Sequence, residues 1–169
     1  VHAPLSTYRA PDTADVVLLE NVPFIAQKEY QCGPAALDMV LGYIGQSPGH
    51  ANLVDWVYSP DRQGSLQPFM VGGVRRAGSV AYEIRGVPAL LSEVAAGHPV
   101  VVLQNLGLNW LPRWHYAVVI GYDVHRSRLI MHSGTTAHIS IEWSRFVSTW
   151  KRGGEWGLLA LPHGSLPHT

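Results

Sequence analysis

The feature that most constrains this chain is the stretch from residue 21 to residue 45, NVPFIAQKEYQCGPAALDMVLGYIG, which contains the only cysteine, Cys32. A short apolar run leads into a polar turn at residues 27–31, and the turn ends at Cys32. Apolar side chains then recur at a spacing of three and four residues, at Leu37, Val40, Leu41 and Ile44. This spacing predicts a helix with one apolar face. Pro34 fits its first turn, where a proline gives up no backbone hydrogen bond, so we expect Cys32 at the amino end of the helix.

A thiol in this position feels the positive end of the helix macrodipole, which favours the thiolate and predicts a lowered pKa for Cys32. A free cysteine is more often a small buried core residue, so its neighbours decide between the two interpretations. Gly33 is expected to let a substrate backbone approach the sulfur. Gln27 is expected to place a side-chain amide beside the thiol as an oxyanion donor, together with the Cys32 backbone N–H. Gln31, directly before Cys32, is expected to point elsewhere.

The pattern Gln-x4-Cys-Gly-Pro-Ala-Ala at residues 27–36 resembles the nucleophile segment of the bacteriocin-leader processing (double-glycine) cysteine peptidases. The run WHYAVVIGYD at residues 114–123 resembles the histidine strand of that family. The resemblance extends from about residue 22 to residue 161. It is nearest to stand-alone exported members of Gram-negative bacteria, which are often followed by helical (tetratricopeptide) repeats. It implies a papain-like fold and a cofactor-free cysteine peptidase that cuts a peptide bond after small residues such as Gly-Gly.

His115 is the candidate base, because it opens an apolar strand after a proline-broken loop. A Cys–His pair must lie within hydrogen-bond reach, and the resemblance implies this proximity of His115 to Cys32. Family members orient the histidine with an acid at the end of the next strand, and here Ser133 stands at that position. A serine hydroxyl can fix the imidazole tautomer but brings no charge. Asp123 is the alternative orienter, although a charged turn residue is the commoner role at such a position.

Substrate contacts are expected from residues beside the two motifs. Aromatic side chains suggest cleft walls, at Tyr30, Trp110, Trp114 and Trp143, although aromatics more often belong to a core. Asn105 either hydrogen-bonds a substrate backbone or makes the turn in which it lies. The expected partner is a polypeptide substrate. The alternative is a catalytically weak module that binds an extended peptide in the same cleft. The missing acid beside His115 favours this alternative. A third hypothesis is transfer or hydrolysis of a non-peptide acyl group.

Composition excludes several other classes. Twelve basic residues balance twelve acidic ones without a basic block, which argues against nucleic acid as a partner. No apolar run is long enough to span a membrane. Nine histidines show no zinc-ligand spacing, so we expect no metal, although His132 and His138 flank a predicted turn. The sequence does not define an oligomeric state.

The pattern predicts an α+β domain at residues 16–162, with a helical half that carries the cysteine and an antiparallel sheet that carries the histidine. A flexible leader is expected at residues 1–15 and a tail at 163–169, before a further domain. Because the first residue is Val1, we expect a removed export signal and a periplasmic location, with the cytoplasm as alternative. After the nucleophile helix, further helices are predicted at 51–58, 65–77, 87–96 and 142–150. Extended segments are predicted at 16–19, 22–25, 80–84, 99–104, 116–122, 129–131, 137–141 and 157–161.

Overall fold

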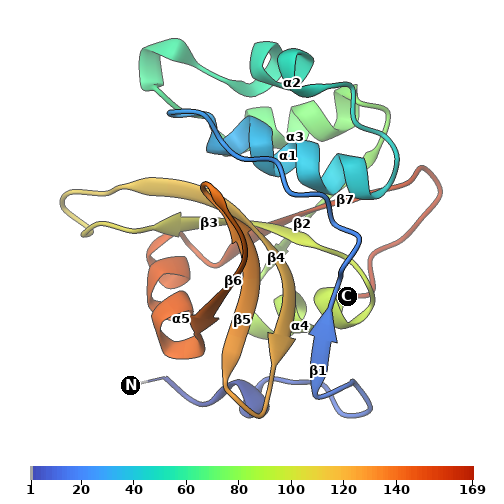
Figure 1. Ribbon diagram of the computed structural model, residues 1–169, viewed down its shortest axis with the longest axis vertical. Helices are drawn as coiled ribbons and strands as arrows, with labels where there is room; N and C mark the ends of the chain where they lie inside the picture. Colours follow the sequence, from blue (N-terminus) through green and yellow to red (C-terminus); the bar gives the residue numbers. More distant parts are fainter. Residues whose placement is uncertain (1) are drawn as a thin grey trace.

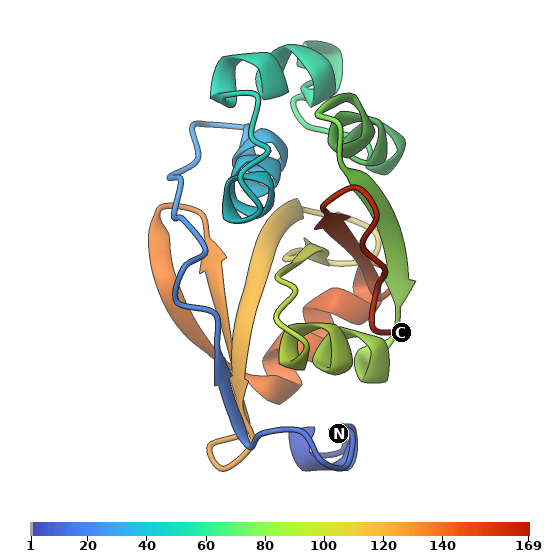
Figure 2. The ribbon, with the colours of Figure 1, turned by 90° about the vertical axis from the view of Figure 1, so that its right-hand side faces the viewer.

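In the computed structural model, which describes residues 2–169, an antiparallel sheet of seven strands lies between two groups of helices (Figure 1, Figure 2). The strands are β1 (Val16–Leu18), β2 (Val80–Arg85), β3 (Val100–Asn105), β4 (Trp114–Asp123), β5 (Arg128–Ser133), β6 (Thr136–Glu142) and β7 (Trp156–Leu161). The α-helices are α1 (Cys32–Tyr43), α2 (His50–Val57), α3 (Gln67–Arg76), α4 (Val87–Ala95) and α5 (Trp143–Arg152). The strand order is β2–β7–β3–β4–β5–β6, and β1 pairs with β4. The predicted α+β class is confirmed.

Helices α1, α2 and α3 cover one face of the sheet, and α4 and α5 cover the other (Figure 1). On the first face, Leu37 and Leu41 of α1 pack against Val118 of β4 in one buried cluster. On the second face, the apolar side of α5 stacks its aromatic rings, with Phe146 lying between Trp143 and Trp150. The cysteine therefore comes from a helical layer, and the histidine comes from the sheet beneath it.

The predicted helices and strands after residue 50 lie within two residues of the observed bounds. Residues 22–25 differ, because they were expected to be extended yet form no strand. Pro23 has no N–H to give to a strand ladder, and the carbonyl of Val22 is instead bound by a side chain, the ring Nε2 of His132, at 3.1 Å.

His132 on β5 holds this entry segment in place. Its Nε2 donates to the Val22 carbonyl, and its Nδ1 accepts from the backbone N–H of His138 at 3.1 Å. This arrangement uses one nitrogen as donor and the other as acceptor, which requires a neutral ring. Burial lowers the pKa of His132, which keeps the ring in that form. The segment that leads to Cys32 is therefore tied to the sheet.

Residues 2–15, where the sequence predicts a flexible leader, make several contacts with the domain. Leu5 is fully buried in the α4–α5 core, and Trp143 Nε1 donates to the carbonyl of Ala3 at 3.1 Å. The hydroxyl of Tyr122 donates to the Ala14 carbonyl at 2.8 Å. The buried leucine and these two bonds connect the segment to the sheet and to α5.

The tail also contacts the domain. The buried carboxylate of Glu93 on α4 accepts from the backbone N–H groups of His168 at 2.9 Å and Thr169 at 2.6 Å. Across residues 2–169, no helix combines the length and the apolar character needed to cross a bilayer.

Candidate active site

Cys32 is the first residue of α1, as predicted from the spacing of apolar residues. The turn before it is tight: Gln31 N donates to the Lys28 carbonyl at 3.0 Å, and Tyr30 adopts a left-handed backbone conformation with φ 61°. Such a conformation is uncommon for a residue other than glycine, and it occurs preferentially at functional sites. The turn leaves the thiol at the start of the helix, where the first backbone N–H groups have no partner within the helix.

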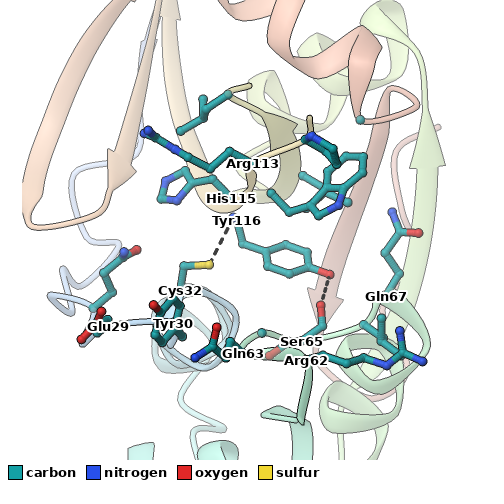
Figure 3. A pocket seen from close by; sticks show the side chains of 18 of the residues that line it. Glu29, Tyr30, Cys32, Arg62, Gln63, Ser65, Gln67, Arg113, His115 and Tyr116 are labelled. Atoms are coloured by element: carbon teal, nitrogen blue, oxygen red, sulfur yellow. Dashed lines mark hydrogen bonds between the residues drawn. The ribbon is translucent and has the colours of Figure 1, made fainter. Parts of the chain in front are cut away.

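Strand β4 meets the thiol from the other side. Its pairing with β5 reaches Val118, which pairs with His132, and β4 continues past this point. There the backbone N–H of Tyr116 donates to Cys32 Sγ at 3.5 Å. Figure 3 shows the sulfur directed toward the start of β4, where His115 and Tyr116 lie. The helix and the strand that carry the two motif residues are thus in direct contact.

His115 is bound by the expected serine. Its Nε2 lies 2.7 Å from Ser133 Oγ. Because Val118 pairs with His132, Ser133 comes opposite residue 117 and is a diagonal neighbour of His115. Asp123 is excluded as the orienter. It ends β4, whereas His115 is the second residue of that strand, roughly 26 Å away at the rise of a β-strand. Its carboxylate accepts from the N–H of Arg126 at 3.1 Å.

Cys32 and His115 line one cavity of about 920 Å³ (Figure 3). Three further residues from the predicted set also line it: Gln27, Tyr30 and Trp114. The two aromatic residues are 45% and 55% exposed, so they present their rings to anything that enters. Trp110 is outside the cavity and 79% exposed, and Trp143 is a core residue, so these two do not form cleft walls.

The two glutamines near Cys32 lie in different surroundings. Gln27 lines the cavity, and its backbone N–H donates to the Gly134 carbonyl at 3.2 Å, next to Ser133. Gln31 points away, with its Oε1 3.4 Å from Nε2 of His50 on α2. Of these two glutamines, Gln27 alone lines the cavity that contains Cys32 and His115.

Gly33 has a different role from the one expected. It is buried, and a Cβ on it would lie 2.7 Å from Ser65 Cβ and 3.1 Å from Met70 Sδ. The missing side chain makes room for the loop before α3, not for a substrate backbone. Asn105 is also structural: its Oδ1 accepts from the N–H groups of Gly107 and Arg113, each at 2.9 Å. It makes the turn, which resolves the alternative left open by the sequence.

Replacing Gly33 with alanine is expected to destabilise the protein by about 1–3 kcal/mol, because the added methyl group overpacks a buried contact. The matched control is Gly72→Ala in α3, where a Cβ meets nothing within 4 Å. That change is expected to stabilise by about 0.5–1 kcal/mol, since alanine is the better helix former. Urea unfolding monitors both variants; a Gly33→Ala protein as stable as the wild type would contradict the assigned packing.

Two residues of the site were not predicted from the sequence. Tyr116 is buried, and its hydroxyl donates to the Ser65 carbonyl at 2.9 Å (Figure 3). It thus connects the sheet to the loop that packs on Gly33. Ser65 lines the cavity, and its buried Oγ has no hydrogen-bond partner among residues 2–169. The motif WHY signalled Tyr116 only as an apolar strand residue, and no local pattern pointed to Ser65.

The electrostatics of the resting site differ from the sequence-based expectation. Burial raises the pKa of the Cys32 thiol above its ordinary 9.0 and outweighs the hydrogen bonds from the backbone N–H groups of Tyr116, Gly33 and Cys32 itself, which lower it. Burial and then the positive charge of Arg113 lower the pKa of His115 below 6.5. The predicted lowering of the thiol pKa is therefore wrong for the free protein: both groups are neutral near pH 7.

No metal centre is evident in the described part of the chain, residues 2–169, where no three His, Cys, Asp or Glu side chains gather. His132 and His138 do lie edge to face, with ring centroids 4.8 Å apart. Both nitrogens of His132 are already engaged with backbone groups. This pair is consequently part of the structure of the sheet.

A model of the Peptidase_C39-like family matches residues 19–155. Three solved structures have the same fold. A protein of Bacillus anthracis described as a C39-like peptidase has a TM-score of 0.73 at 19% identity, over 90% of this chain and 100% of that one. A double-glycine-motif protease from an AMS/PCAT transporter, solved with its leader peptide, has a TM-score of 0.62 at 20% identity, over 91% and 96%. The peptidase domain of Streptococcus ComA, a bifunctional ABC transporter, has a TM-score of 0.67 at 20% identity, over 84% and 99%. No curated protein matches.

Proposed function

Because the chain belongs to the C39-like peptidase family, we propose that it is a cysteine peptidase with Cys32 as nucleophile and His115 as general acid and base. The observation that carries the proposal is that these two residues line one cavity while Ser133 occupies only the Nε2 atom of His115. When Nε2–H donates to Ser133, the lone pair of Nδ1 is free to accept the thiol proton. Ser133 thus acts as the orienting residue.

The neutral resting pair determines the first step. As the peptide carbonyl binds, the Cys32 S–H proton moves to Nδ1 of His115 while the sulfur forms a bond to the carbonyl carbon. The protonated His115 then gives this proton to the leaving amine, the C–N bond breaks, and an acyl-enzyme remains. Water next loses a proton to His115 and attacks the thioester carbon, the C–S bond breaks, and the peptide leaves with a new carboxyl group. His115 returns its proton to the sulfur, which restores both neutral groups.

The negative charge on the carbonyl oxygen needs donors in place before the reaction. We assign this role to the side-chain amide of Gln27, which lines the cavity, and to the Cys32 backbone N–H at the start of α1. The bond from Gln27 N to Gly134 O supports the assignment, because it fixes the glutamine loop to the turn that also carries Ser133.

The proposed substrate is an extended peptide cut after small residues. The AMS/PCAT protease that shares this fold is named for a double-glycine motif and binds a leader peptide. Here Tyr30 and Trp114 line the cavity on the turn before Cys32 and at the start of β4. A peptide with Gly-Gly before the scissile bond would bring its carbonyl to the sulfur without a bulky side chain between these rings.

Two pH profiles test the mechanism. In the wild type, alkylation of free Cys32 by iodoacetamide follows the thiolate and should keep rising above pH 9.0, because burial raises the pKa of that thiol. Hydrolysis of a Gly-Gly peptide should instead decline only as the pH falls below 6.5, where His115 becomes protonated at its lowered pKa. In His115→Ala no base takes the thiol proton, so the residual hydrolysis needs preformed thiolate. The pH profiles of hydrolysis and of alkylation should therefore coincide in this variant.

Wild-type hydrolysis that rises in parallel with alkylation as the pH increases would contradict proton transfer from Cys32 to His115.

A second candidate function, a peptide-binding module, is favoured by one observation: the residue on Nε2 of His115 is an uncharged serine. Binding of the Gly-Gly peptide without turnover at any pH would select that function.

A further inference from the structure

The connection between β3 and β4 is a hairpin with an apolar end. Residues 106–112, LGLNWLP, contain no charged side chain. We define the hairpin tip as Leu108, Trp110 and Leu111, whose side chains are 52%, 79% and 63% exposed. Figure 1 shows this hairpin, in yellow, projecting from the sheet. Single exposed apolar residues are ordinary, but a contiguous group at a projecting end indicates an interaction surface.

Hydrogen bonds within the hairpin fix its conformation. Leu108 and Leu111 exchange both backbone bonds, N to O, at 3.0 and 3.1 Å. The side chain of Asn105 accepts from two backbone N–H groups at the base, and its Nδ2 donates to the Leu108 carbonyl at 3.3 Å. These bonds leave the apolar side chains exposed to solvent. They also satisfy backbone N–H and C=O groups, whose transfer out of water would otherwise cost free energy.

The tip lies outside the proposed catalytic cavity. Other residues of the same connection line the cavity, Leu106 and Pro112 among them, whereas the three tip residues do not. Peptide and small-molecule sites are concave, but this tip is convex. A projecting group of leucine and tryptophan suits a deformable apolar phase, and tryptophan in particular favours the boundary between lipid and water.

Three basic residues lie at or next to the base of the hairpin in the chain or in space. Arg113 follows the apolar run directly. The guanidinium of Arg152, in the last turn of α5, donates from Nε and Nη2 to the Asn105 carbonyl at 3.3 and 3.1 Å. Lys151 precedes it and is exposed. An apolar tip with cations behind it is complementary to a bilayer with anionic headgroups.

We propose that the hairpin tip inserts into the interface of an anionic lipid bilayer. Because the same connection lines the cavity, the protein would dock with its cleft close to the membrane surface. The proposal does not depend on catalysis, since vesicle binding is measured without hydrolysis.

The test is sedimentation with phosphatidylcholine vesicles, with and without phosphatidylglycerol. The wild type should bind the anionic vesicles. The triple variant Leu108→Ser/Trp110→Ser/Leu111→Ser should bind them with an affinity at least about tenfold lower. The matched control, Val16→Ser/Phe69→Ser/Leu166→Ser, removes three apolar residues of similar exposure elsewhere and should bind as the wild type. Urea unfolding confirms that each variant is folded.

A wild type that stays in solution with both kinds of vesicle overturns the proposal, as does equal loss of binding in the control. If vesicles are not bound and the tip variant instead raises KM for a soluble peptide, the tip is a peptide-docking surface and the membrane proposal is wrong. If high salt weakens binding to the anionic vesicles, this result supports the role of the basic residues.

Discussion

In a Cys32→Ala variant, hydrolysis of a Gly-Gly peptide is expected to fall by about 10⁴-fold or more, the scale seen when a member of a catalytic triad is lost. The substitution removes the only thiol of the chain, so no acyl-enzyme can form. The side chain is partly buried at the first position of α1, and alanine is a good helix former there. Stability should therefore change little, and mass spectrometry of the cleavage products against time measures the loss directly.

The partner variant His115→Ala should lose about 10²–10⁴-fold, the usual contribution of a general base. Because the two residues act in one step, the double variant should be about as inactive as Cys32→Ala alone. Asp123→Asn is the matched control, since this carboxylate lies at the opposite end of the same strand and contacts Arg126. Losses that multiply in the double variant, or a large loss in Asp123→Asn, would contradict the assigned pair.

Much of this site could be predicted because its residues follow local rules. The three- and four-residue spacing after Cys32 indicates a helix, and Pro34 indicates where the helix begins. The strand that carries His115 is a nearly continuous apolar run. Ser133 was predicted from the family resemblance, which places the orienting residue at the end of the next strand; the antiparallel pairing of β4 with β5 brings that end beside the start of β4.

The parts that could not be predicted depend on contacts between distant segments. Gly33 sits beside Ser65 only because the loop before α3 folds back onto α1. The pKa of Cys32 depends on how much protein covers the sulfur, and here burial outweighs the helix end and the hydrogen bonds that favour the thiolate. A helix dipole can be inferred from sequence, whereas desolvation requires knowing the neighbours.

The roles of Asn105 and the hairpin illustrate the same limit. An asparagine in a glycine-containing turn is compatible with substrate binding and with turn formation. Its side chain here is buried and bonds three backbone groups of its own connection, so it serves the turn. That bonding is what holds the leucine and tryptophan side chains of the tip in water, a feature that composition alone does not reveal.

The second large effect is expected on kcat when Gln27, the proposed oxyanion donor, is replaced. Gln27→Ala is expected to lower kcat by about 10²–10³-fold, as the loss of one preorganised donor does elsewhere, with KM little changed because the amide acts mainly on the charged intermediate. Gln31→Ala is the control, with the same chemical change four residues away. Its side chain contacts His50 outside the cavity, so kcat should stay within about twofold of the wild type.

Gln27→Glu sharpens this test, because a carboxylate keeps the size of the side chain but cannot donate and repels the developing oxyanion. It should be at least as inactive as Gln27→Ala. Cys32 alkylation in the absence of peptide should be little affected in Gln27→Ala, since the resting thiol takes its hydrogen bonds from backbone N–H groups. If instead Gln31→Ala caused the large loss and Gln27→Ala did not, the donor would have to come from the α1–α2 side, and the geometry proposed for the intermediate would be wrong.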